Sequence, residues 1–317
     1  MCSILFASTQ VYAYKYGLGS CLDQSLDQVI WEAIQEENLD GFIFLGDNVY
    51  GDQPNGQLFK MKNAYEIQKT RLPKWLMKEK EILAIWDDHD FGLNDGGRDY
   101  LYKEKAKKMF LNFWNVDEND PRNYREGLYF KKVKNIDGAE IEIIALDTRY
   151  FRSKLNGKKN AYKPDINPQA TILGKEQWDW FQSSITNSTA KAIIILSSIQ
   201  VLATDHPYEK WANFPLERSK LISILSEAAQ DKVIIVVSGD RHRSGIYQNN
   251  FFIEITASSL NKPGSKFKET DPLLIGETFP EMNYGILDIQ PLQNKITLSL
   301  HDKKGEKLNS KIINFFQ

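Results

Sequence analysis

The chain of 317 residues is predicted to fold as a mixed α/β protein, in which two facing sheets are wrapped by helices. Short apolar strands alternate with helices along most of the sequence, and the last strands follow one another as antiparallel hairpins. Hydrophobic residues make up 42% of the chain, enough for a substantial core without disulfides. Because it contains no repeat and no low-complexity linker, a single large domain is the simplest organisation.

The predicted strands of the first half are short apolar runs that end in Gly or polar residues. They cover a segment ending at residue 20 and residues 41–45, 82–86, 127–133 and 140–146. The predicted helices of this half place apolar residues three and four positions apart. They cover residues 25–37, part of 58–77, and 103–114.

The second half begins with the same alternation and ends in strands. The predicted helices follow Gly174 and cover residues 215–229. The predicted strands cover residues 192–198, 233–237, 251–256, 284–289, 296–301 and 311–315. Residues 164–174 and 261–280 are expected to be long loops near the functional site, where they would shape substrate access.

Charge and hydropathy exclude two classes of partner. A net charge of −2 and a pI near 6.2 give no electrostatic case for a stable nucleic-acid partner. The basic cluster from Lys103 to Lys108 lies on a predicted amphipathic helix, so we interpret these lysines as its solvated face. No run approaches the roughly 20 apolar residues that span a bilayer, so no transmembrane segment is expected.

Side chains that bind metals follow one of the predicted strands. GDNVYGD at residues 46–52 ends the run 41–45 and brings Asp47, Tyr50 and Asp52 close together. A carboxylate at the carboxyl end of a buried strand must be paired, hydrogen-bonded or coordinated to a metal. Taken alone, this segment is equally compatible with a helix cap or an Asx turn.

Three further segments repeat this pattern. WDDHDFGLND at residues 86–95 holds four carboxylates, one imidazole and one amide. In SGDRHRS at 238–244, Asp240 and His242 are two positions apart and would face one ion in an extended segment. GSC at 19–21 ends in Cys21, which alone would more often be an inert buried residue. The convergence of four such strand ends predicts a metal site.

These segments resemble the alkaline phosphatase D family, the PhoD-like metallophosphatases of the calcineurin-like metallophosphoesterase superfamily. The likeness runs from about residue 16 to about residue 302, with its blocks in the family's order. They are GSC at 19–21, FLGDNVYGD at 44–52, WDDHDFGLND at 86–95, LDTRYFRS at 146–153, LGKEQWDW at 173–180, SSIQVL at 197–202 and SGDRH at 238–242. The resemblance implies a four-layer αββα sandwich in a single domain over residues 14–317.

The resemblance also implies a dinuclear centre that holds Fe³⁺ and Ca²⁺. The implied iron ligands are Cys21, Asp47, Tyr50 and His242. Asp47 would bridge to calcium, which Asn94 and Asp240 would also hold, with Asp95 or Asp88 as alternatives to Asn94. Ligand chemistry supports two different metals, because thiolate and phenolate stabilise a high positive charge whereas carboxylates and amides suit a hard divalent ion.

The expected function is hydrolysis of a small phosphate ester, either a monoester or a diester, by metal-bound hydroxide. Asp88 or His89 would orient the phosphoryl oxygen or protonate the departing alkoxide. Arg149 and Arg241 each follow a strand and would form charge-assisted hydrogen bonds to phosphate oxygens. For Arg149, a structural salt bridge to Asp147 is the alternative.

Two other functions stay open at this point. A catalytically silent protein with the same fold would capture a phosphorylated ligand without turning it over. A metal-free hydrolase would use Cys21 as nucleophile and His242 as base. For the organic part of a substrate, Tyr208 and Trp211 are the candidate contacts.

Residues 1–13 are interpreted as a possible signal-peptide remnant or a disordered N-terminus, because an apolar stretch and a small-residue ending lack a positive n-region. Export to the periplasm or the extracellular space is the first expectation, and the cytoplasm is the alternative. The two cysteines, Cys2 and Cys21, cannot form a disulfide framework. A monomer is the default oligomeric state.

Overall fold

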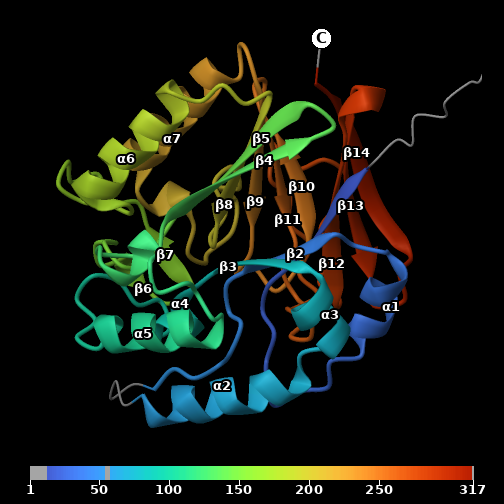
Figure 1. Ribbon diagram of the computed structural model, residues 1–317. Helices are drawn as coiled ribbons and strands as arrows, with labels where there is room; N and C mark the ends of the chain where they lie inside the picture. Colours follow the sequence, from blue (N-terminus) through green and yellow to red (C-terminus); the bar gives the residue numbers. More distant parts are fainter. Residues whose placement is uncertain (1–12, 54–57, 316–317) are drawn as a thin grey trace, which may run out of the picture.

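The computed structural model describes residues 13–53 and 58–315 and shows two stacked six-stranded sheets with helices outside both (Figure 1). The helices that pack on the first sheet are α1 (Ile30–Glu36), α2 (Phe59–Arg71), α3 (Lys74–Glu79) and α5 (Lys103–Phe113). Those on the second sheet are α6 (Gly174–Thr186) and α7 (Pro215–Ala228). The expected four-layer αββα sandwich is therefore confirmed. Of the predicted N-terminal segment, residues 1–12 lie outside the described residues.

The first sheet brings three strand ends to one edge. Its strand order is β14 (Lys307–Asn314), β13 (Lys295–Asp302), β12 (Asn283–Gln290), β1 (Tyr14–Gly19), β2 (Gly41–Leu45) and β3 (Glu81–Ile85). The pairs β1–β2 and β2–β3 are parallel, whereas β12, β13 and β14 join as antiparallel neighbours. The segments that follow β1, β2 and β3 therefore leave the sheet side by side.

The second sheet has a parallel centre and antiparallel edges. Its strand order is β10 (Gly245–Gln248), β11 (Ile253–Thr256), β9 (Val233–Ser238), β8 (Ala192–Ser197), β5 (Ala139–Ala145) and β4 (Phe130–Ile136). Strands β5, β8, β9 and β11 pair in parallel, and β4 and β10 pair antiparallel at the two edges. The sequence pattern predicted every strand of this sheet except β10.

An apolar layer fills the space between the sheets and includes Leu18, Ile43, Ile194, Ile235 and Leu298, all fully buried. Strands β2 and β8 are buried at every position, because helices cover the face that the other sheet does not. Such strands read as unbroken apolar runs in the sequence. This is why their predicted positions are close to those observed.

Three local features differ from the sequence-based expectations. The helical segment at 58–77 is split into α2 and α3, because Leu72 before Pro73 is extended, as the residue before a proline prefers. A small hairpin of β6 (Asn156–Lys158) and β7 (Ala161–Lys163) was not expected. Lys107 on α5 is buried and donates to the carbonyl of Arg125, so it does not belong to a solvated face.

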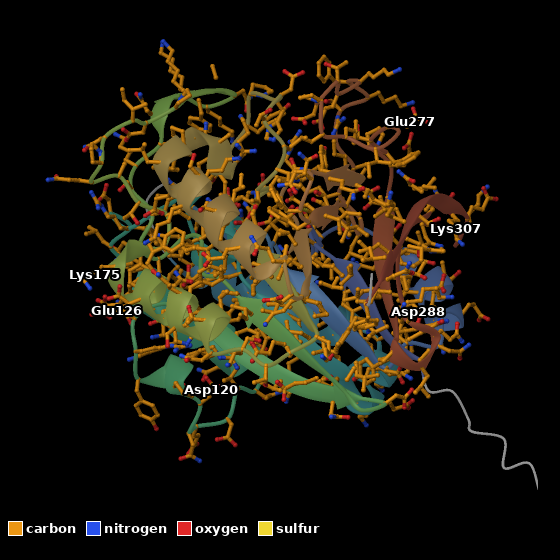
Figure 2. The ribbon with its side chains drawn as sticks, turned by 90° about the horizontal axis from the view of Figure 1, so that it is seen from above. Asp120, Glu126, Lys175, Glu277, Asp288 and Lys307 are labelled. Atoms are coloured by element: carbon orange, nitrogen blue, oxygen red, sulfur yellow. The ribbon has the colours of Figure 1, made fainter. Side chains whose placement is uncertain are left out.

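Charged side chains surround this apolar interior. Seen from above, Lys175 on α6, Glu277 and Lys307 on β14 lie at the periphery of the molecule (Figure 2). Lys175 pairs with Asp179 at 2.5 Å, but both side chains are largely exposed, so the pair contributes little stability. None of the helices in the described part of the chain has both the length and the apolar character needed to span a bilayer.

Candidate metal centre

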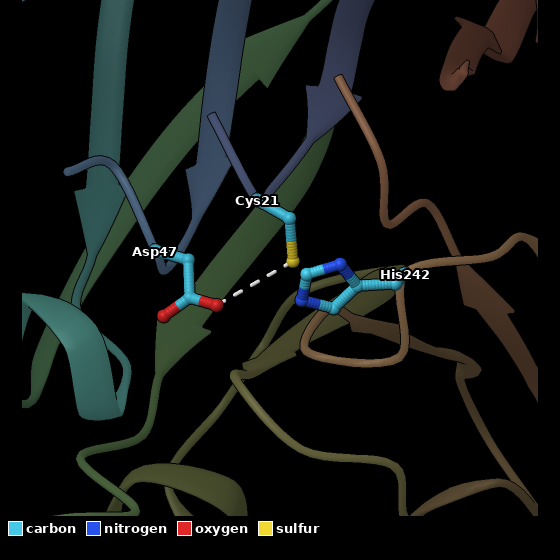
Figure 3. A group of neighbouring side chains, drawn as sticks. All are labelled: Cys21, Asp47 and His242. Atoms are coloured by element: carbon cyan, nitrogen blue, oxygen red, sulfur yellow. Dashed lines mark hydrogen bonds between the residues drawn. The ribbon is translucent and has the colours of Figure 1, made fainter. Parts of the chain in front are cut away.

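Cys21, Asp47 and His242 converge from three separate segments of the chain (Figure 3). Cys21 and Asp47 follow β1 and β2 of the first sheet, and His242 follows β9 of the second. One ligand atom from each lies within 4.8 Å of the others. The turns themselves are joined, because the backbone N–H of Cys21 donates to the carbonyl of Gly46 at 3.3 Å. The expected meeting of these segments is observed.

Tyr50 completes this group. Its hydroxyl donates to Oδ2 of Asp47 at 3.2 Å and lies 3.4 Å from Nε2 of His242. Burial and the neighbouring Asp47 carboxylate raise the pKa of Tyr50 well above its usual value, and burial raises the pKa of Cys21 to about 11. A nearby cation is what would favour the ionised thiolate and phenolate here. The donor set therefore fits a highly charged cation.

Four carboxylates, three of them buried and Asp240 partly buried, form an adjoining group that shares Asp47. One oxygen each of Asp47, Asp87, Asp88 and Asp240 lies within 4.8 Å of the others. Among the described residues, Oδ2 of Asp87 and Oδ1 of Asp88 have no hydrogen-bond partner. Carboxylates crowded in a largely buried group favour a bound cation, and an all-oxygen donor set suits a hard divalent ion.

Several of these residues have a strained backbone. Cys21, Asp47, Asp240 and His242 have φ angles of 57°, 52°, 65° and 52°, in the left-handed region that residues other than glycine rarely adopt. Such conformations cost about 1–3 kcal/mol each and persist where the surrounding structure enforces them. Here they bend the chain sharply after strands β1, β2 and β9, which keeps the side chains at the edge of the sandwich.

The role of Asn94 as a calcium ligand stays a prediction. The residue lies on the wall of the neighbouring cavity, and its Oδ1 accepts a hydrogen bond from Nζ of Lys159 at 2.7 Å. Of its two alternatives, Asp88 belongs to the four-carboxylate group, whereas Asp95 accepts from the Tyr162 hydroxyl at 2.7 Å. Asp87 belongs to the group as well, although no local pattern distinguished it from its neighbours in the acidic motif.

His89 lies between carboxylates at the rim of this group. Its Nδ1 is 2.6 Å from Oδ1 of Asp52, and its Nε2 is 3.9 Å from Oδ1 of Asp88. Burial alone would lower the pKa of His89, but Asp88, Asp47 and Asp52 together raise it to about 10. These carboxylates therefore favour the protonated imidazole, the form that is able to donate a proton.

Arg149 is fully buried and does not line the cavity. The expected salt bridge to Asp147 is wrong: the guanidinium pairs with Asp87 and Glu209, each at 2.5 Å. Asp147 instead accepts the backbone N–H groups of Arg149 and Tyr150, both at 2.9 Å, and so stabilises the turn after β5. Contact of Arg149 with a phosphate stays a prediction.

A cavity of about 230 Å³ opens beside the carboxylates. Its lining combines acidic residues with the cations Lys159, Arg241 and Arg243. Arg241 pairs with Glu269 and stacks over the ring of Tyr208 at 4.6 Å. Tyr208 lines the cavity and is 38% exposed, so its ring is accessible, and its contact with a substrate stays a prediction.

Trp211, the other aromatic candidate for contact with the organic group, belongs to the core. It is fully buried, and its Nε1 donates to Oγ of Ser197 at 3.0 Å. Its indole packs near Trp178 of α6, with ring centroids 6.3 Å apart. A residue enclosed in this way cannot contact a substrate in the cavity.

The sequence model of a family described as PhoD-like phosphatase matches residues 76–288, well over half of the chain. The chain belongs to the PhoD-like phosphatase family. This confirms the resemblance seen in the sequence motifs. The matched range contains the acidic motif of residues 86–95 and the segment with Asp240 and His242, whereas Cys21, Asp47 and Tyr50 precede it.

A curated protein similar in sequence to this chain is alkaline phosphatase D of Bacillus subtilis (strain 168). The two are 26% identical over 310 residues, which cover 84% of this chain and 49% of the relative. The chain thus spans about half the length of the relative it matches. The roles of individual residues in this PhoD-like chain remain predictions.

Solved structures show the same fold at low sequence identity. PhoD matches with a TM-score of 0.75 and 18% identity, covering 96% of this chain and 69% of its own. GAP50 of Plasmodium matches with a TM-score of 0.65 and 12% identity, and the match covers 95% of this chain and 89% of GAP50. Purple acid phosphatase PPD1 from yellow lupin (Lupinus luteus) matches with a TM-score of 0.62 and 10% identity, and the match covers 96% of this chain and 54% of the lupin enzyme. At these identities the matches establish the architecture alone.

Proposed function

We propose that this protein hydrolyses phosphate esters at a dinuclear metal centre. The observation that carries the proposal is the sharing of Asp47 between two groups of largely buried ligand residues, one with Cys21 and His242 and the other with Asp87, Asp88 and Asp240. A shared carboxylate is the usual bridge in two-metal sites of hydrolases. Membership of the PhoD-like phosphatase family supports the same reaction class.

The two groups of donors differ in chemistry, which supports two different ions. We assign Fe³⁺ to Cys21, Tyr50, His242 and Asp47, because thiolate and phenolate stabilise a trivalent ion. We assign Ca²⁺ to Asp47 and Asp240 together with Asn94 or Asp88, with Asp87 beside them, because calcium prefers oxygen donors. When bound, such a pair would polarise the phosphoryl group and lower the pKa of the attacking water.

The remaining polar residues of the site would handle the proton and the substrate. His89, protonated and oriented by Asp52 at 2.6 Å, is suited to protonate the departing alkoxide. Arg241 lines the cavity and would contact a phosphate oxygen. Tyr208 would pack against the organic group of a small monoester or diester. We also propose an exported protein, with the cytoplasm as the alternative location.

One observation argues against a metal-free thiol hydrolase. Burial raises the pKa of Cys21 to about 11, which disfavours the thiolate near neutral pH when no cation is bound. Only a measurement of turnover distinguishes an enzyme from a catalytically silent binding protein with the same fold.

The test combines metal analysis with an assay. Bound metals are measured by mass spectrometry, and hydrolysis of bis-p-nitrophenyl phosphate and p-nitrophenyl phosphate is followed before and after chelation. We expect iron and calcium in equal amounts and hydrolysis that chelation abolishes. Hydrolysis that survives complete metal removal would contradict the proposal, and bound metal without turnover on any ester would indicate a binding protein.

A further inference from the structure

Two buried arginines, Arg149 and Arg152, contact the two ends of the acidic segment of residues 87–96. At its start, Nε and Nη2 of Arg149 each lie 2.5 Å from Oδ1 of Asp87. At its end, Nη2 of Arg152 donates to the carbonyls of Asp95 and Gly96, at 2.5 and 2.6 Å. Both arginine side chains are fully buried, so their positions are fixed by these contacts.

Glu209 joins the two arginines. Its Oε2 accepts from Nη1 of Arg149 at 2.5 Å, and its Oε1 lies 2.8 Å from Nε of Arg152. The Glu209 side chain is only 2% exposed. It comes from a part of the chain more than 100 positions after the acidic segment, so it connects two distant regions. We call Arg149, Glu209 and Arg152 the arginine clamp.

From this geometry we propose that Glu209 is a positioning residue, which through the arginine clamp holds the acidic segment in the shape that binds the divalent cation. The inference rests on the proposed function, because it concerns the oxygen-donor half of the same centre. Without the Glu209 carboxylate, the two buried guanidinium groups would lose the counter-ion they share, and the ion pair between Arg149 and Asp87 would not neutralise both charges. The arginines would then move, and Asp88 between the two ends of the segment would move with them.

A change at Glu209 should affect the binding of calcium and leave the binding of iron intact. Cys21, Tyr50 and His242 belong to the turns after β1, β2 and β9. Within the described residues, the ion pairs and hydrogen bonds of the arginine clamp do not involve these three residues. Iron binding should therefore survive a change at Glu209 that weakens calcium binding.

The decisive variant is Glu209→Gln, with Glu254→Gln as its matched control. Glu254 is also a buried carboxylate, but it accepts the backbone N–H groups of Val201 and Leu202, away from the acidic segment. Calcium affinity is measured by titration calorimetry on iron-loaded protein. Iron is followed by mass spectrometry and by the visible absorption of a tyrosinate–iron(III) pair. These readouts do not depend on catalytic turnover.

We expect Glu209→Gln to raise the calcium Kd roughly 10–100-fold, the usual effect of losing a contact that orients metal ligands. Iron content and the visible band should be retained, and Glu254→Gln should keep the wild-type calcium affinity. An unchanged calcium Kd in Glu209→Gln would overturn the positioning role, and so would parallel loss of both metals. Wild-type protein that binds neither metal would instead defeat the proposed function itself.

A second variant covers the case in which Glu209→Gln does not fold. Arg152→Lys keeps a positive charge for Glu209 but cannot donate to two carbonyls in the fixed geometry of a guanidinium group. It should also raise the calcium Kd, by a smaller factor, with the iron band retained. Wild-type calcium affinity in Arg152→Lys would overturn the proposal.

Discussion

The sulfur of Cys21 lies 3.5 Å from a carboxylate oxygen of Asp47, although 26 positions separate the two residues in the chain. The parallel pairing of β1 and β2 produces this proximity, since it brings both strand ends to one edge of the sheet. Burial raises the pKa of both groups, so it favours their protonated forms when no cation is bound. Metal binding should therefore release protons and strengthen as pH rises.

The first prediction concerns Tyr50. Tyr50→Phe removes the proposed phenolate ligand, so the visible charge-transfer band of the iron-loaded protein should disappear and iron affinity should fall by at least about tenfold. The measurement is absorption spectroscopy combined with metal analysis. Tyr65→Phe is the matched control, because Tyr65 is also 6% exposed but lies among α2 residues away from the centre. A band that persists in Tyr50→Phe would remove Tyr50 from the ligands.

Calcium should stabilise the fold. The four carboxylates of Asp47, Asp87, Asp88 and Asp240 lie within 4.8 Å of one another, and calcium would relieve their repulsion only in the folded state. Free calcium at 100 times its Kd should add about 2.7 kcal/mol to the free energy of unfolding. Thermal denaturation across a calcium series measures this increase. A Tm independent of calcium would show that the group binds none.

The third prediction concerns the packing of Gly46 against the acidic segment. A Cβ added at Gly46 would lie 2.5 Å from Cβ of Asp87, closer than atoms can pack. Gly138 also has a positive φ, but nothing lies within 4 Å of an added Cβ there. Gly46→Ala should therefore lose about 1–3 kcal/mol more stability than Gly138→Ala. Chemical denaturation tests this, and equal losses in the two variants would contradict it.

The fourth prediction is a pH effect at Lys210. Burial and the neighbouring Arg241 lower the pKa of Lys210 from its usual 10.5 to about 8. Between these values the unfolded chain binds the proton and the folded protein does not, so this residue makes stability rise with pH over that range. Its contribution should total up to about 3 kcal/mol. Denaturation at several pH values measures it.

The control for Lys210 uses an exposed lysine. Lys210→Met should flatten the rise in stability between pH 8 and 10.5, because the group responsible is gone. Lys303→Met, in the exposed turn between β13 and β14, should keep the wild-type profile. If the two variants have the same profile as wild type, the lowered pKa of Lys210 is wrong.

Much of the architecture and half of the site are readable from the sequence. Strands β2 and β8 are buried on both faces, so their apolar runs are unbroken. The β6–β7 hairpin escapes prediction because its strands have three residues each and are mostly exposed, which leaves no apolar alternation to detect. The motifs that contain Cys21, Asp47 and His242 follow the apolar strands β1, β2 and β9, and their place at strand ends made them predictable as ligands.

Asp87 and Glu209, which were not singled out from the sequence, depend on contacts that local patterns do not encode. Asp87 and Asp88 are adjacent, and in an extended strand only one of them would face the centre. Both reach it because α4 (Asp88–Phe91) begins between them and turns the chain. Glu209 has its partners about 60 positions earlier, at Arg149 and Arg152, so no nearby residue indicates its role.

The left-handed turns at Cys21, Asp47, Asp240 and His242 determine how the centre would be assembled. Because the backbone of these turns fixes where the donor atoms lie, the coordination cage would be set by the fold of the loops. Loading should then need little rearrangement. Related proteins with this scaffold would be able to change metals by exchanging donor atoms at fixed positions, without redesigning the loops that carry them.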